Sequence, residues 1–193
     1  MTERIEPRIV RYGGAMFGSE EIDQVNGVLS DPMGVVPGIK VSEFENRVAS
    51  FMGKNHGVMV NSGSSALMLA MRLLDLPKGA EIITPALTFS TDISSMYFAG
   101  YKPVFVDVGL NNYQILVNCI EDVITDNTKA ILVPDLVGGI CDWDVLRKIA
   151  DKHDLKLVQD SADTLGGSLR GIKTATRADI TITSFSIYHI ITA

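Results

Sequence analysis

The stretch KAILVPDLVGGICDWDVLRKIADKHDLKLVQD, residues 129–160, decides the fold. It opens and closes with short apolar runs, Lys129–Pro134 and Leu155–Asp160, which are typical of buried strands. Between them, Asp144–Asp154 has the spacing of an amphipathic helix, and Asp142 can cap its start. A helix that joins two strands in this way is typical of parallel strands, which need a long crossover connection. The stretch therefore predicts an α/β fold.

The same alternation continues outward in both directions. Further short strands, rich in β-branched residues, alternate with segments of helical periodicity. Six strands separated mostly by helices predict a three-layer sandwich, in which helices cover both faces of a mostly parallel sheet. The remaining strands are predicted at Gly57–Asn61, Glu81–Pro85, Pro103–Val108 and Asp179–Phe185, and the remaining helices after caps at Ser19 and Ser42 and at Ser65–Leu74, Ser90–Ala99 and Cys119–Ile124.

Length and composition are those of a soluble single-domain protein. The 193 residues suit one domain, predicted at 19–193, after an irregular segment at 1–18. The net charge of −6 argues against a nucleic-acid surface, and no apolar run approaches the ~20 residues of a membrane span. The start of the chain lacks the apolar core of a signal peptide. Cys119 and Cys141 form neither a disulfide framework nor a CxxC pair, so the sequence predicts a cytoplasmic protein without a metal site.

The segment after the first predicted strand has the composition of an anion site. In parallel sheets a ligand binds beyond the carboxyl ends of the strands, so the residues that follow each strand are the candidates for function. Residues 61–67, NSGSSAL, place Gly63 and Ser64 between a strand and a helix, where unpaired N–H groups and the helix dipole favour a phosphate. An ordinary helix cap with a glycine turn is the alternative. Neither a GxGxxG nor a P-loop signature is present.

Candidate side chains also follow the other strands. Phe89 can stack on a flat ring or belong to the core. Asp160 ends a buried strand, where a carboxylate needs a positive partner such as a protonated pyridine nitrogen, or it caps the next turn; Asp163 can lie on the same side. Ser184 and His189 follow the last strand, although a lone histidine is more often structural than catalytic. Together, an anion cup, an aromatic plate, a carboxylate and a base predict a site for a flat, phosphorylated pyridine.

Six motifs, in order, resemble the large domain of the DegT/DnrJ/EryC1/StrS family, the fold-type I pyridoxal-phosphate enzymes that act on nucleotide-linked sugars. The resemblance extends from about Arg11 to the last residue. It implies pyridoxal or pyridoxamine 5'-phosphate as cofactor and a homodimer as the assembly. The motifs are RYGG (11–14), VNSGSSAL (60–67), EIITPALTFSTD (81–92), PVFVDV (103–108), QDSADTLGG (159–167) and SFSIYHIIT (184–192).

The resemblance also implies a role for each candidate residue. Gly63 and Ser64 bind the cofactor phosphate through backbone and hydroxyl groups, and Ser184 adds a further hydroxyl. Phe89 stacks on the pyridine ring, and Asp160 pairs with the ring nitrogen.

The position of the family's cofactor-binding lysine holds a histidine. That lysine lies five residues after the serine of SFxxxK, where this chain has His189. Histidine at this position, together with an aspartate at Asp163, resembles the sugar 3-dehydrases of deoxysugar and lipopolysaccharide biosynthesis. An imidazole holds no stable covalent bond to the cofactor, so the resemblance implies free pyridoxamine phosphate. His189, with an ordinary pKa of about 6.5, would act as general base while the C3 hydroxyl leaves a nucleotide-linked 4-keto-6-deoxyhexose.

The chain departs from the family pattern in several places. Asp135 stands where relatives often carry histidine, and residues 186–188 and 190 differ from the usual motif. Family members continue beyond the position of Ala193 with a smaller carboxyl-terminal domain, and their sites are completed by a partner subunit. We therefore expect an incomplete large domain, inactive by itself.

Two other functions compete with the dehydrase. A sugar aminotransferase needs a lysine near residue 189, and the last lysine is Lys173. A non-catalytic piece that self-associates through an exposed sheet edge is the third possibility.

Overall fold

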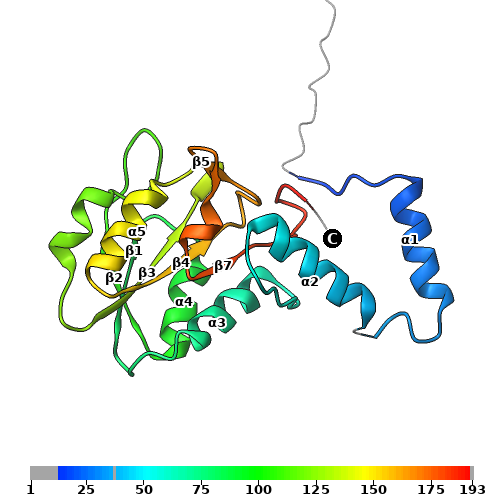
Figure 1. Ribbon diagram of the computed structural model, residues 1–193, viewed down its shortest axis with the longest axis horizontal. Coiled ribbons are helices and arrows are strands. Elements are labelled where there is room, and N and C mark those ends of the chain that lie inside the picture. The colour runs from blue at the N-terminus through cyan, green and yellow to red at the C-terminus, as the bar shows by residue number, and fades with distance from the viewer. Residues whose placement is uncertain (1–12, 37, 192–193) are drawn as a thin grey trace, which may run out of the picture.

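Five parallel strands form the central sheet of the computed structural model, which describes residues 13–36 and 38–191 (Figure 1). Most of the predicted irregular segment at 1–18 lies outside the described residues. The strand order is β2-β1-β3-β4-β7, and every neighbouring pair is parallel. The strands are β1 (Glu81–Pro85), β2 (Lys102–Val106), β3 (Thr128–Pro134), β4 (Lys156–Asp160) and β7 (Ile180–Ile182).

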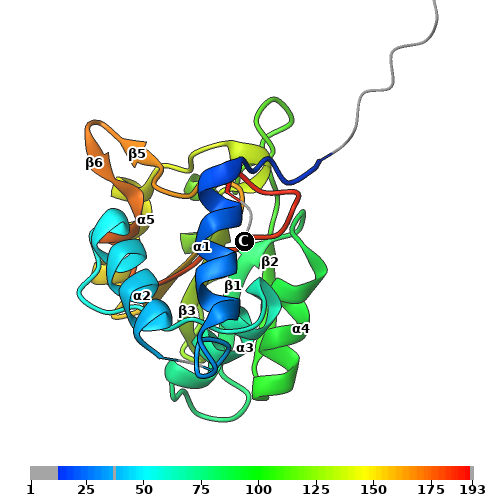
Figure 2. The ribbon, with the colours of Figure 1, turned by 90° about the vertical axis from the view of Figure 1, so that its right-hand side faces the viewer.

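Helices cover the sheet on both faces, which confirms the predicted α/β sandwich (Figure 2). Neighbouring residues of a strand point to opposite faces, so a central strand needs apolar side chains throughout. Ile82 packs in one core cluster with Met71 and Met96, whereas Ile83 packs in the other with Trp143. The first cluster lies under α3 (Gly63–Leu73) and α4 (Ser90–Ala99), and the second lies under α5 (Trp143–Lys152).

Two further helices precede these layers. The helix α2 (Ile39–Met52) buries Ala49 and Met52, whereas α1 (Ser19–Ser30) buries none of its residues and lies beyond α2, away from the sheet (Figure 1). The short elements are η1 (Val117–Cys119), η2 (Glu121–Val123), η3 (Leu136–Gly138), η4 (Thr174–Arg177) and the hairpin β5 (Ser168–Leu169) and β6 (Ile172–Lys173). None of the described helices is long and apolar enough to cross a membrane.

The predicted strand at Gly57–Asn61 is wrong. This segment has no strand partner within the described residues, and a strand exists only through hydrogen bonds to a neighbour. Its Met59 N–H donates instead to Glu45 Oε1 at 2.8 Å, which ties the segment to α2. The apolar run of residues 57–61 therefore predicted a strand where the structure has an unpaired segment.

Both predicted amino-terminal helix caps are also wrong. The helix α1 is capped by Gly18, one residue before Ser19, and Gly18 N–H donates to Glu21 Oε2 at 2.6 Å. The helix α2 is capped by Gly38, and Ser42 lies inside it, with its N–H donating to Gly38 O at 3.1 Å. The cap predicted at Asp142 is confirmed, because its carboxylate accepts from Val145 N–H at 3.3 Å.

Candidate cofactor site

The start of α3 and the end of β7 meet at the carboxyl edge of the sheet. Ser62 caps α3, and its hydroxyl accepts from Ser65 N–H at 3.1 Å. The first N–H groups of a helix have no partner within the helix, which leaves those of Gly63 and Ser64 to face a ligand. A Cβ on Gly63 would lie 3.0 Å from Ser184 Cβ and 3.3 Å from its hydroxyl oxygen. Glycine is thus the residue that lets the cup and Ser184 approach one another.

We expect Gly63→Ala to weaken binding of a phosphate group about tenfold, or ~1.4 kcal/mol. The added methyl group must displace Ser184, because the present approach leaves no room for it. Calorimetric titration with inorganic phosphate and with pyridoxamine phosphate measures the change. Gly27→Ala is the control, since a Cβ there meets nothing within 4 Å. Equal affinities for the wild type and Gly63→Ala would show that phosphate binds elsewhere.

Phe89 lies at the cap position of α4 with its side chain largely in solvent. Its exposed fraction is 62%, so the alternative that Phe89 belongs to the core is wrong. Two residues further along, Thr91 Oγ1 lies 3.3 Å from Ser64 Oγ, which joins the start of α4 to the start of α3. An exposed ring beside the cup is available to stack on a planar ligand.

The Asp160 carboxyl group is buried at the end of β4. Its Oδ1 accepts from Ala162 N–H at 2.9 Å, so it caps the next turn, as one of the two alternatives predicted. Burial raises the pKa of Asp160, and the neighbouring carboxyl group of Asp92 raises it further. A cationic ligand nitrogen would relieve both effects.

His189 lies close to Asp163, in the segment that follows β7. Its Nε2 is 3.7 Å from Asp163 Oδ1, and the other carboxylate oxygen of Asp163 accepts from Val137 N–H at 2.9 Å. The side chain of His189 is 19% exposed, and Nδ1 is buried without a hydrogen-bond partner in the described residues. The backbone of this segment turns back, because His189 N–H donates to Ser186 O at 2.9 Å.

Contacts and one charge interaction join the predicted site residues in a closed circuit. The circuit draws on α3, α4, the turn after β4 and the segment after β7, which are separate in sequence. Phe89 belongs to it through its carbonyl oxygen, which accepts from Asp92 N–H at 3.0 Å. The contacts run from Ser184 to Gly63, Ser64 to Thr91, Asp92 to Asp160, Asp163 to His189, His189 to Ser186, and Ser186 back to Ser184, and the charge of Asp163 acts on Asp160.

These residues fit a phosphorylated pyridine cofactor. The cup provides a glycine and helix N–H groups for a phosphate, and the acidic side of the circuit provides carboxyl groups for a protonated ring nitrogen. The buried, unpartnered Nδ1 of His189 is a polar atom that a ligand can satisfy.

Asp135 also lies at this edge, but other parts of the protein occupy its carboxylate. Oδ1 accepts from Cys141 N–H at 3.0 Å and from Trp143 Nε1 at 2.8 Å. Oδ2 accepts from Gln159 Nε2 at 2.7 Å and from Thr164 Oγ1 at 3.2 Å. Burial raises the pKa of Asp135, and these donors act in the opposite direction. The residue that departs from the family pattern is therefore a structural carboxylate.

Asp92 is the site residue that the sequence did not reveal. Its carboxyl group is fully buried, accepts from the Thr88 hydroxyl and contacts Asp160. In the sequence, an aspartate in the first turn of a helix is explained by the helix dipole alone. One signal was available in the sequence. Because α4 follows the buried end of β1, its first turn was expected to be buried rather than exposed to solvent.

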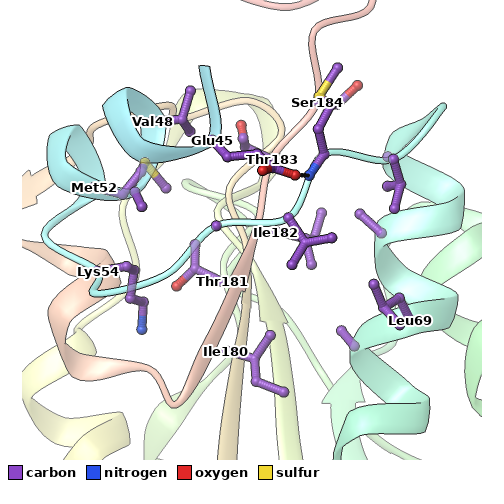
Figure 3. A pocket seen from close by; sticks show the side chains of 18 of the residues that line it. Glu45, Val48, Met52, Lys54, Leu69, Ile180, Thr181, Ile182, Thr183 and Ser184 are labelled. Atoms are coloured by element: carbon purple, nitrogen blue, oxygen red, sulfur yellow. Dashed lines mark hydrogen bonds between the residues drawn. The ribbon is translucent and has the colours of Figure 1, made fainter. Parts of the chain in front are cut away.

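A cavity of 580 Å³ adjoins the cup on its other side (Figure 3). It lies between α2, α3, β7 and residues 57–61, and most of its lining is apolar. It shares Gly63 and Ser184 with the cup but contains neither Asp160 nor His189. Lys54 Nζ borders it and donates to Ala178 O at 2.5 Å; burial lowers the pKa of Lys54. The polar candidate site is therefore the circuit at the sheet edge, and the cavity is its apolar neighbour.

The fold is that of the large domain of pyridoxal-phosphate-dependent aminotransferases. The putative sugar aminotransferase Spr1654 from Streptococcus pneumoniae, in its PMP form, superposes with a TM-score of 0.88 at 28% identity, covering 95% of this chain and 50% of that one. The E. coli GDP-4-keto-6-deoxy-D-mannose-3-dehydratase with bound hydrated PLP gives a TM-score of 0.79 at 30% identity, covering 83% of this chain and 43% of that one.

The chain belongs to the DegT/DnrJ/EryC1/StrS aminotransferase family, whose model matches residues 16–193. Among curated relatives, dTDP-4-dehydro-2,6-dideoxy-D-glucose 3-dehydratase of Saccharopolyspora spinosa is 35% identical over 193 aligned positions, or 95% of this chain. The alignment covers 41% of that relative, so the chain spans less than half of its length. Relatives thus include both 3-dehydratases and aminotransferases.

Proposed function

We propose that this chain is the cofactor-binding part of a pyridoxamine-phosphate-dependent 3-dehydratase that acts on a nucleotide-linked 4-keto-6-deoxyhexose. The observation that carries the proposal is His189, at the position of the family's lysine and in contact with Asp163 within the circuit of site residues. An imidazole can move a proton but cannot form the stable covalent bond through which a lysine holds the cofactor. Similarity to dehydratases from two organisms supports the assignment.

Each residue of the circuit has a role in this proposal. Gly63, Ser64 and Ser184 hold the phosphate, and Phe89 covers one face of the ring. Asp160 pairs with the ring nitrogen. When bound, the cofactor supplies an amine that condenses with the C4 ketone and a ring that accepts electrons.

The proton step belongs to His189 and Asp163. The carboxylate of Asp163 lies on the Nε2 side of the imidazole ring and orients it. Nδ1, which has no partner in the described part of the chain, would then be the atom of His189 that accepts a proton as general base in the loss of the C3 hydroxyl. A correctly placed general base contributes about 10²–10⁴-fold to the rate.

The substrate, the homodimer and the cytoplasmic location are proposed for a protein of the relatives' length. The present chain corresponds to 41–50% of the three relatives described above. The names of the two dehydratases specify different nucleotides and sugars, so the proposal specifies the substrate as a class.

A sugar aminotransferase is the second candidate, supported by the similarity to Spr1654. That reaction needs a lysine at the site. Lys173 is held elsewhere, because its Nζ donates to Phe51 O and lies 4.6 Å from the centre of the Phe51 ring. Lys54 is held by Ala178 O beside the apolar cavity. Neither lysine belongs to the circuit.

Cofactor titration of the 193-residue chain tests the proposal. We expect pyridoxamine phosphate to bind reversibly. Treatment with pyridoxal phosphate and borohydride is expected to label only surface lysines, and excess pyridoxamine phosphate should not reduce that labelling at any lysine. A protected lysine would instead support the aminotransferase. Absence of any binding would support the third candidate, a non-catalytic chain that self-associates through the free edge of β7, and sedimentation velocity would then detect that association.

A further inference from the structure

Asp92 and Asp160 form a buried pair of carboxyl groups. Asp92 comes from the first turn of α4 and has an exposed fraction of 0%, and Asp160 comes from the end of β4 and has 7%. The two carboxyl groups lie close enough for each to change the pKa of the other. Two ionised carboxylates repel one another and only accept hydrogen bonds, so a direct contact between them requires a proton on one of them.

No cation within the described residues neutralises the pair. Neither carboxyl group takes part in an ion pair with lysine, arginine or histidine. The groups that face the pair are the Thr88 hydroxyl, which donates to Asp92 Oδ2, and the Asp163 carboxylate, whose charge acts on Asp160. His189 lies beyond Asp163. Asp92 Oδ1 is buried and has no protein donor.

We propose that Asp92 is a positioning residue that shares one proton with Asp160 and thereby fixes the carboxylate that receives the ring nitrogen. The inference rests on the proposed function for its ligand, whereas the shared proton is a property of the protein without ligand. The pKa of Asp160 is raised more than that of Asp92, so in the protein without ligand the shared proton rests mainly on Asp160. A protonated ring nitrogen beside Asp160 would favour transfer of this proton to Asp92, so that Asp160 presents the charged oxygen. The proton moves within the pair, and none is gained or lost.

The electrostatics of the site agree with this arrangement. Burial raises the pKa of both groups, and the contact with Asp92 raises that of Asp160 further, as expected when like charges share a site. The folded protein then holds more protons than the unfolded chain above the ordinary aspartate range. Stability therefore falls as pH rises from that range toward the raised pKa of the pair.

Infrared difference spectroscopy on the ligand-free protein tests the shared proton directly. At neutral pH we expect the C=O band of a protonated carboxyl group in the wild type and its loss in both Asp92→Asn and Asp160→Asn. Asp126→Asn, at an exposed aspartate, is the control. A wild-type spectrum without this band, or a band that persists in Asp92→Asn, would overturn the inference. Neither result depends on cofactor binding, so each is distinguishable from failure of the proposed function.

Titration with pyridoxamine phosphate across pH 6–9 tests the positioning role. We expect Asp92→Ala to weaken binding about tenfold, the effect of one pKa unit. Asp92→Asn should restore most of the affinity, because an amide keeps the hydrogen bonds, but with a pH dependence shifted to lower values. Urea denaturation should also depend less on pH in Asp92→Asn than in the wild type. If the two variants bind equally weakly with the wild-type pH dependence, Asp92 has only a packing role and the inference is wrong.

Discussion

Replacing His189 with lysine is expected to turn reversible cofactor binding into covalent capture of pyridoxal phosphate. The residue stands within the circuit beside Asp163, so a lysine amine placed there meets the aldehyde of a cofactor held by the cup. Borohydride reduction followed by peptide mass analysis should find a modification at residue 189 that approaches one per chain, against background in the wild type. This is a change from none to nearly complete.

The control for this variant is a lysine at the next position in the same segment. Ile190→Lys adds the same amine beside the site, at a side chain that is already largely exposed. We expect it to be labelled only as much as the surface lysines, without protection by pyridoxamine phosphate. Equal labelling of His189→Lys and Ile190→Lys, in a protein that still binds cofactor, would mean that residue 189 does not face the cofactor.

The second large effect is expected on stability, from Asp135→Ala. The substitution removes the acceptor of four hydrogen bonds, leaves Trp143 Nε1 and Cys141 N–H without an acceptor in the interior, and takes one of two acceptors from Gln159 Nε2. Each buried donor without a partner costs about 1–3 kcal/mol, and relief from burying a charge offsets part of the total. We expect the free energy of unfolding to fall by about 3 kcal/mol in urea denaturation followed by circular dichroism.

Two variants separate this effect from a general loss of charge. Asp135→Asn keeps one oxygen for the Trp143 and Cys141 donors and should recover part of the stability. Asp122→Ala, at an exposed aspartate of η2, should change stability by no more than about 0.5 kcal/mol. If Asp135→Ala is as stable as Asp122→Ala, the hydrogen bonds of Asp135 do not stabilise the fold.

The fold could be predicted where local pattern and tertiary context agree. The strand Glu81–Pro85 and the helix Ser90–Ala99 have the predicted bounds, because an apolar run followed by a turn and a helix is explicit in the sequence. The segment Gly57–Asn61 has the same apolar character but lacks a neighbouring strand. Whether a segment forms a strand depends on a neighbouring strand to which it can hydrogen-bond, and this cannot be predicted from the segment alone. Ser42 was likewise predicted to cap α2, but the helix begins earlier, after its cap residue Gly38.

The sequence predicted individual site residues at the end of each strand, but it did not predict the contacts between their side chains. Placement after a strand indicated Phe89, Asp160 and His189, and their proximity followed from the sheet. The contact between Asp92 and Asp160 depends on how α4 packs against the sheet, which no short motif encodes. The functional roles of these residues remain predictions that the experiments above test.

The single tryptophan has a practical consequence for those experiments. Trp143 is the chain's one indole, fully buried and hydrogen-bonded to Asp135, and the backbone N–H of Asp135 donates to Asp160 O at 3.0 Å. Fluorescence excited in this indole therefore comes from one point, next to the strand end that holds the proposed ring-binding carboxylate. The protein carries an intrinsic optical reporter at that edge, with no competing emitter of its kind and no need for a label.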